Sequence, residues 1–126
     1  MKKDIELYRK ILKVLEDNDE EYFHIAYDKP MQIKGYENKE VVYNLKLMFD
    51  DELIKGQHKF DGLAVIEVSA KPTSQGHDFI KVTKDEGLWN SFKEQVGPQI
   101  QSIPLTVMIS LLKDWTTVYF KNKLGI

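Results

Sequence analysis

The sequence predicts an α+β fold: a winged helix-turn-helix-like domain with a β-hairpin wing and two additional C-terminal helices. Two observations lead to this prediction. Residues 38–54 carry apolar side chains at the spacing of a helix, and residues 53–58 and 63–69 follow at once as two segments that should pair antiparallel. In a winged helix-turn-helix domain, such a helix can enter a DNA groove while the ribbon lies against the backbone.

Length and composition indicate one soluble domain. With 126 residues, 42% hydrophobic and 30% charged, the chain can bury a single core. We expect one domain, 1–126, with the core and wing in 1–72 and the additional helices in 73–126. The absence of cysteine excludes disulfides, thiolate zinc sites and cysteine nucleophiles. Neither a signal peptide nor a membrane span is recognisable, so we expect a cytoplasmic protein with no membrane partner.

The first third of the chain is expected to form a helix and a strand. Apolar residues recur every three or four positions over residues 4–16, with Asp4 placed to cap the helix. Residues 22–27 alternate like a strand, and a second short extended piece is expected around residues 31–33. The interval before residue 38 leaves little room for the other helix of a helix-turn-helix pair, which should be shortened or replaced by extended chain.

The remaining elements follow from apolar spacing and turn residues. The helix from Asn38 should bury one face, formed by Val41, Val42, Leu45, Met48 and Phe49. Asp61-Gly62 predicts the hairpin turn, because both residues tolerate positive φ. Thr73 should cap a helix that runs to about Val96, with Gly87 bending or breaking it and Gly97-Pro98 ending it. A last helix is expected from about Pro104 to Lys121.

The charge of the chain weighs against a dedicated nucleic-acid binder. The formal net charge is −2, the pI is about 5.9 and Arg9 is the one arginine, whereas phosphate contacts favour a basic excess and arginine is the commonest reader of guanine. Residues able to touch DNA are nevertheless expected on the outer face of the 38–51 helix and near the ribbon tip. These candidates are Lys39, Tyr43, Asn44, Lys46, Lys55, Gln57, His58 and Lys59.

Acidic residues leave a second interpretation open. Glu40, Asp50 and Asp51 share the helix surface with the candidate lysines and repel phosphates. The first interpretation is a DNA-binding or transcription-associated protein that contacts double-stranded DNA. The alternative is a non-enzymatic scaffold in which the same fold meets a protein partner, because one fold can host many functions.

His77-Asp78 invites a catalytic or metal-binding interpretation, which the rest of the sequence does not support. The three histidines, His24, His58 and His77, lie in separate segments without metal-ligand spacing. No nucleophile or second base is positioned by a recognisable motif. We expect His77 and Asp78 to order the first turn of a helix, where a carboxylate suits the helix dipole. The expectation is no enzyme activity, no metal and no cofactor.

The last helix carries apolar residues on two faces. One apolar face suffices to dock a helix on its own core, so the second is covered either by a central position in the core or by a symmetry mate. We expect a homodimer. The expected interface residues are Val107, Leu111, Trp115 and Val118.

Four pieces of the sequence, in order, carry a resemblance to a known family. They are residues 4–12, Gly35-Tyr36 leading into 42–45, Thr73-Ser-Gln-Gly-His-Asp-Phe79 followed by Trp89, and the closing helix that ends at residues 123–125. The chain resembles a family of small, uncharacterised proteins from bacteria and their prophages, a domain of unknown function. The Thr-x-x-Gly-His-Asp-Phe piece is fairly specific.

The resemblance implies a winged-helix-like fold over nearly the whole chain, a bacterial or prophage origin and no established activity. Two positions depart from the family pattern. The family has His where this chain has Asn44, and Gly where this chain has Glu52.

Overall fold

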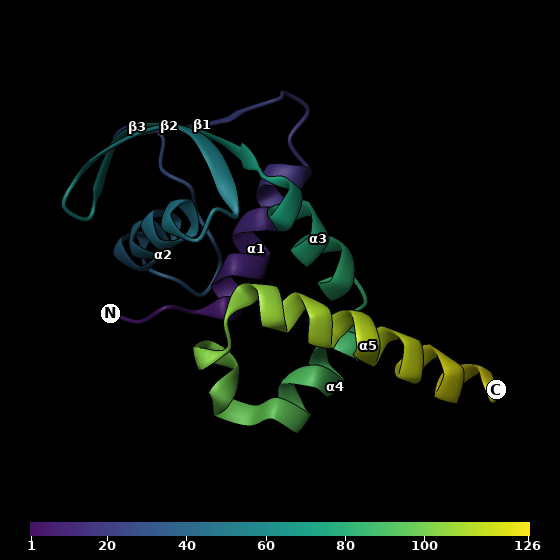
Figure 1. The fold of residues 1–126 in the computed structure, drawn as a ribbon. Coiled ribbons are helices and arrows are strands. Elements are labelled where there is room, and N and C mark those ends of the chain that lie inside the picture. Colours follow the sequence, from purple (N-terminus) through teal and green to yellow (C-terminus); the bar gives the residue numbers. More distant parts are fainter. The chain divides into compact units, whose positions relative to one another are not determined.

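The computed structural model describes residues 1–126 and has an α+β architecture (Figure 1). Five α-helices and a short 3₁₀ helix accompany one three-stranded antiparallel sheet. The chain divides into two compact units, residues 1–77 and 78–126. The predicted α+β class and the predicted hairpin are confirmed.

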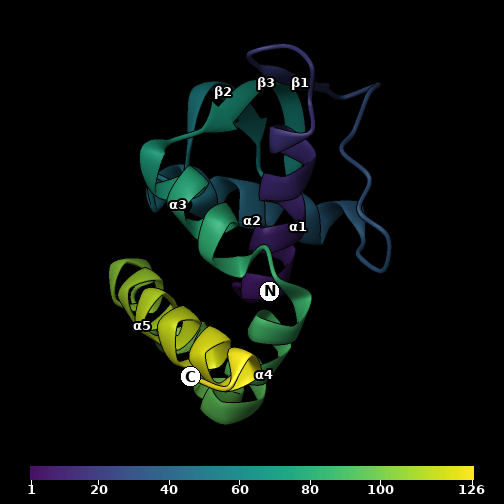
Figure 2. The same ribbon diagram turned by 90° about the vertical axis from the view of Figure 1, so that its right-hand side faces the viewer.

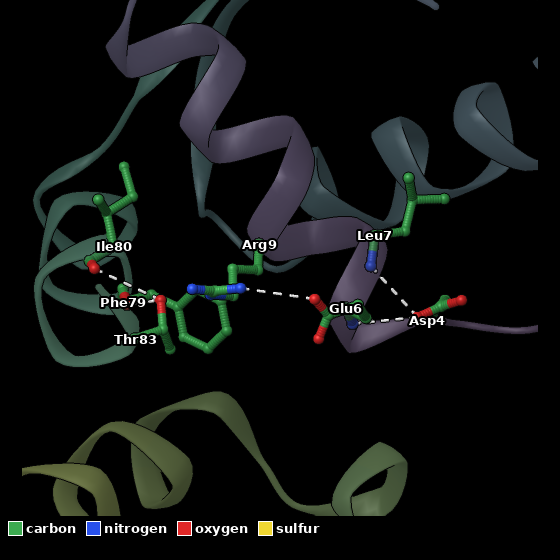
Figure 3. A network of polar contacts seen from close by, with 7 residues as sticks. All are labelled: Asp4, Glu6, Leu7, Arg9, Phe79, Ile80 and Thr83. Atoms are coloured by element: carbon green, nitrogen blue, oxygen red, sulfur yellow. Dashed lines mark hydrogen bonds and ion pairs between the residues drawn. The ribbon is translucent and has the colours of Figure 1, made fainter. Parts of the chain in front are cut away.

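The first helix, α1 (Ile5–Glu16), begins where the sequence predicts. The Asp4 carboxylate accepts hydrogen bonds from the backbone N–H groups of Glu6 and Leu7 at 3.0 and 3.2 Å (Figure 3). Glu6 in turn lies 3.5 Å from the Arg9 guanidinium, one turn further along. A capping carboxylate at this end satisfies free N–H groups and suits the helix dipole, which explains the sharp start of α1.

The second helix, α2 (Asn38–Asp50), starts at its predicted residue, where the Glu40 carboxylate accepts a hydrogen bond from the Glu37 N–H at 3.0 Å. Between α1 and α2 lies the strand β1 (Phe23–Ala26), and no helix forms there. The expectation that this interval holds no full additional helix is therefore confirmed. Residues 31–33 form no strand, although Met31 and Ile33 are buried.

The sheet is completed by β2 (Ile54–Asp61) and β3 (Ala64–Pro72), in the order β1-β3-β2. The hairpin register pairs Asp61 with Ala64, so the two turn residues are Gly62-Leu63, one residue beyond the predicted Asp61-Gly62. Gly62 has φ 58° and Leu63 has no positive φ. A two-residue turn with positive φ at its first position alone needs glycine there, which places the turn at Gly62.

Helices α1 and α2 lie on one face of this sheet, and the opposite face is open (Figures 1 and 2). The covered face and the two helices bury a shared apolar core. Its members include Tyr8, Ile11, Leu12, Ile25, Val42, Leu45, Met48, Val65 and Val68. Phe49, predicted as core, is half-buried instead.

The Thr73–Phe79 piece connects the sheet to the third helix, α3 (Ser74–Thr83). The Thr73 hydroxyl accepts a hydrogen bond from the Gly76 N–H at 3.1 Å, as predicted for the cap, and donates to the Glu52 carbonyl at 2.6 Å. A Cβ atom on Gly76 would lie 2.2 Å from the Leu53 carbonyl oxygen, so only glycine fits. Phe79 is buried against the Trp89 ring. These residues therefore have structural roles.

The predicted helix from 73 to 96 is two helices, which is a correction. α3 ends at Thr83, whose hydroxyl donates to the Phe79 and Ile80 carbonyls at 2.7 and 3.4 Å (Figure 3). The next helix, α4 (Glu86–Val96), begins after Asp85, whose carboxylate accepts from the Leu88 N–H at 2.8 Å. The interruption therefore lies at residues 84–85, because Asp85 is a good N-cap, and Gly87 lies within α4.

The chain continues as the 3₁₀ helix η1 (Gly97–Ser102) and the last helix, α5 (Leu105–Leu124). Gly97 has φ 70° and Pro98 follows it, so the predicted stop at this pair is confirmed. α5 ends three residues later than predicted. Its end is set by Gly125, which adopts the left-handed conformation at φ 74°.

Candidate nucleic-acid interface

Three of the predicted contact residues form one stripe along α2. Lys39, Tyr43 and Lys46 occupy positions i, i+4 and i+7, and all three are exposed or half-buried. Lys46 donates a hydrogen bond through Nζ to the Gly62 carbonyl at 3.2 Å, and its ammonium lies 5.7 Å from the centre of the Phe60 ring. Lys46 thus joins α2 to the end of the hairpin, which lies beside α2 in Figure 1.

An aromatic cluster strengthens the same connection. The ring centres of Phe49 and His58 are 4.2 Å apart, and the Phe60 ring lies 5.7 Å from His58 and 6.3 Å from Phe49. His58 pairs in register with the buried Val68, so its ring belongs to the sheet face that α2 covers. Nothing in the spacing of the sequence indicated that Phe49 leaves the core to pack on the hairpin.

The other predicted ribbon residues lie on the opposite face of the sheet. In register, Lys55 faces Lys71, Gln57 faces Ser69 and Lys59 faces Glu67. Directly opposed residues of an antiparallel pair point to the same side, and this side is the one away from α1 and α2. The predicted contact set is therefore divided between two surfaces, α2 with the hairpin end and the open sheet face.

The prediction that the ribbon residues lie near the ribbon tip is wrong for two of the four, Lys55 and Gln57. The turn is Gly62-Leu63, and Lys55 lies six residues before Asp61. At roughly 3.4 Å per residue, that separation is about 20 Å. Strand β2 continues to Asp61, and Lys55 and Gln57 lie in its first half, away from the turn.

On the open sheet face, two of the three lysines lie beside carboxylates. Lys71 forms an ion pair with Glu21, and this hydrogen-bonded contact lowers the pKa of the Glu21 carboxyl and raises the pKa of Lys71. Lys59 is directly opposite Glu67, and His24 contacts the Ser69 hydroxyl at 2.8 Å. A phosphate approaching this face would meet a carboxylate beside these two lysines.

Asn44 is buried, and this corrects its prediction as a DNA contact. Its Oδ1 atom accepts from the Asp4 N–H at 2.9 Å, and its Nδ2 atom donates to the carbonyls of Glu40 and Lys2 at 2.9 and 3.4 Å. Asn44 is 1% exposed and both Nδ2 hydrogens have acceptors inside the protein, so it presents no group to a base edge. The spacing of the sequence does indicate that this position is buried, because Asn44 lies on the same helix face as the apolar residues Val41 and Leu45, at i, i+3 and i+4.

The C-terminal end of α2 is acidic. Asp50, Asp51 and Glu52 follow one another there, and the Tyr8 hydroxyl donates to the Asp51 carboxylate at 2.9 Å. Burial is the main cause of a raised pKa at Tyr8, and this hydrogen bond raises the pKa further. Residues 1–77 as a whole contain 12 of the 18 basic and 15 of the 20 acidic residues. The stripe on α2 is thus a local basic feature on an acidic unit.

The predicted dimer residues lie on α5, in the other unit. Val107, Leu111 and Val118 expose 47%, 42% and 57% of their surface, so the second apolar face of α5 is uncovered in the single chain. Trp115 is half-buried, and its ring centre lies 6.0 Å from that of Phe92. Trp115 therefore serves the packing of α4 on α5 as well as the exposed face.

One family model matches residues 2–101, and it is described as Hypothetical protein (DUF2513). The chain belongs to the DUF2513 family. The resemblance to a domain of unknown function is confirmed, but residues 123–125, one of the four pieces that carried it, lie outside the match, as does α5. The DUF2513 description assigns no activity. No curated protein and no solved structure matches the chain. None of its helices combines the length and the apolar content that crossing a membrane requires.

Proposed function

We propose that residues 1–77 form a winged-helix DNA-binding module of a transcription-associated protein of bacterial or prophage origin. The order helix, strand, helix, hairpin supports this proposal, as does the sheet order β1-β3-β2, in which the hairpin strand β3 lies between its two neighbours. The observation that carries it is the Lys46–Gly62 hydrogen bond. It joins the exposed side of α2 to the hairpin turn, so that both present one surface to a duplex.

The chemistry of this surface favours phosphate contact over base readout. Lys39 and Lys46 supply point charges for phosphates, and the Tyr43 hydroxyl can donate to a phosphate oxygen. The basic residues of α2 are lysines and Asn44 is buried, so Asn38, exposed at the first position of the helix, is its one side chain of the kind that reads a base with two hydrogen bonds. We therefore expect weak, strongly salt-dependent binding.

The test is a titration of a labelled duplex of about 25 base pairs with the full chain, followed by fluorescence anisotropy at roughly 50 and 200 mM salt. The test variant is Lys39→Gln/Lys46→Gln. The matched control is Lys55→Gln/Lys59→Gln, which removes the same charge from the open sheet face. The test variant should bind more weakly, and its salt slope should fall by about 1 for each phosphate that a lysine no longer neutralises.

The control should retain the affinity and the salt slope of the unchanged chain. Equal weakening in both double variants would contradict a site on α2 and the hairpin end. No binding at the lower salt concentration would defeat the DNA proposal.

A second candidate is a non-enzymatic protein-interaction scaffold. It is favoured by the acidic excess of residues 1–77 and by the acidic end of α2 formed by residues 50–52. Such a surface suits a partner with basic side chains better than a phosphate backbone. The same titration separates the two candidates, because only the first expects salt-dependent binding to DNA.

A further inference from the structure

The exposed face of α5 carries the repeat of a coiled-coil seam. Leu111, Trp115, Val118 and Asn122 follow one another at alternating spacings of four and three residues. These are the a and d positions of a heptad, with Trp115 and Asn122 at a and Leu111 and Val118 at d. The seam is incompletely covered within the chain, because Leu111 and Val118 are 42% and 57% exposed.

A groove runs beside this seam, between α4 and α5. Its volume is about 730 Å³, and it is open to solvent along one side. Its walls are mainly apolar. The residues that supply this apolar lining are Phe92, Val96, Leu111, Trp115, Val118 and Tyr119. An open apolar groove between two helices is the kind of surface that receives the apolar face of a further helix.

We infer that the α4–α5 groove is occupied by α5 of a second copy of this chain, running antiparallel. A two-fold axis brings the same surface together on both sides, so each α5 enters the groove of the other copy. In this arrangement, Trp115 lies opposite Val118 of the partner subunit, and Leu111 lies opposite Asn122 of the partner subunit.

Charge complementarity selects the second copy and the antiparallel direction. Asp114 and Lys121 are exposed and occupy successive g positions, on the same side of the seam. Seven residues separate them, about 10 Å along the helix axis, which is too far for an ion pair within one chain. When Trp115 lies opposite Val118 of the partner subunit, Asp114 faces Lys121 of the partner subunit, and the symmetry repeats the pair. A parallel arrangement would put Asp114 opposite Tyr119 of the partner subunit.

The association is tested on the full chain by light scattering coupled to size-exclusion chromatography over roughly 1 to 100 μM. The expected mass is twice the 14.7 kDa of the chain. Leu111→Glu places a charge in the seam and should give a monomer with an unchanged circular dichroism spectrum. Thr117→Glu, at an exposed position of α5 outside the seam, should remain dimeric. A monomer at every concentration, or a Leu111→Glu variant that stays dimeric, would overturn the inference.

A charge exchange tests the direction of pairing. Asp114→Lys and Lys121→Asp should each weaken the dimer about tenfold, because each replaces two attractive pairs by two repulsive ones. The double variant Asp114→Lys/Lys121→Asp should recover the original dissociation constant. Failure of the double variant to recover would overturn the antiparallel register. The outcome is independent of DNA binding, because α5 contains none of the residues proposed to touch DNA.

Discussion

The Oδ1 atom of Asn44 accepts a hydrogen bond from the backbone N–H of Asp4 at 2.9 Å, across 40 residues of sequence. Asp4 is also the cap of α1, so one side chain of α2 holds the start of α1 in place. The same amide donates to the Glu40 and Lys2 carbonyls. Asn44 therefore fixes the N-terminal segment against α2.

The first prediction is that Asn44→Ala destabilises the protein. The variant leaves the Asp4 N–H without its acceptor in a partly buried place, so the free energy of unfolding should fall by about 2 kcal/mol. Urea denaturation monitored by circular dichroism measures the change. Lys39→Ala, at an exposed position of the same helix, should change stability by less than about 0.5 kcal/mol. An Asn44→Ala variant as stable as the unchanged chain would show that these hydrogen bonds contribute nothing.

The second prediction is that Glu52→Gly stabilises the protein. Glu52 is the one non-glycine residue with positive φ, at 58°, and it follows the C-terminal cap of α2. The left-handed conformation costs a residue with a Cβ atom about 1–2 kcal/mol, whereas glycine adopts it without that cost. The free energy of unfolding should rise by about 1 kcal/mol, measured by urea denaturation.

The matched control for Glu52→Gly is Asp50→Gly, a substitution two residues earlier, in the last turn of α2. Glycine in a right-handed helix lowers stability by about 0.5–1 kcal/mol, so the two glycine substitutions should have opposite signs. A decrease of stability in both variants would show that the backbone conformation at Glu52 carries no strain.

The third prediction concerns alkaline pH. Burial is the main cause, and the charge of Asp4 the second cause, that raises the pKa of Tyr36 to about 12. Burial and the hydrogen bond to Asp51 also raise the pKa of Tyr8. An unfolded tyrosine titrates near 10, so above that pH the unfolded chain loses protons that the folded chain keeps. The stabilising contribution is complete below about pH 10 and is lost as the pH rises towards the folded pKa values.

The measurement is the urea midpoint at several values between about pH 8 and pH 11. Tyr8→Phe removes one of the two groups, so its midpoint should fall less steeply over this range than that of the unchanged chain. Tyr27→Phe, at a side chain that is 80% exposed, should follow the unchanged chain. Equal slopes for all three proteins would contradict a raised pKa at Tyr8.

Local signals in the sequence predicted much of the fold. The Asp4 cap, the start of α2 at residue 38 and the stop at Gly97-Pro98 depend on side chains and backbone only a few residues apart, and all three were confirmed. A bend or break of the helix over residues 73–96 was predicted at Gly87, but the structure places the break two residues earlier, before the cap at Asp85. The cap at Asp85, and not the glycine at position 87, therefore sets the start of α4.

The candidate site was less predictable, because its surfaces are set by strand register. Lys55, Gln57 and Lys59 alternate with His58 along β2, and this alternation already separates them into two faces. Which face is covered depends on the pairing with β3 and on the position of α2. The register also decided that the turn is Gly62-Leu63, one residue beyond the predicted Asp61-Gly62, and that Lys55 lies near the other end of the strand.

The sequence by itself determined the α+β class, the main helices and the hairpin, because periodicity, caps and turn residues act over short distances. Only the tertiary structure decided which partners the polar side chains of α2 contact within the protein. The amide of Asn44 is engaged by Asp4 and Lys2, and Lys46 is directed to Gly62. These partners lie far away in sequence, and a hydrogen bond of that kind forms only when the folded core brings its two ends together.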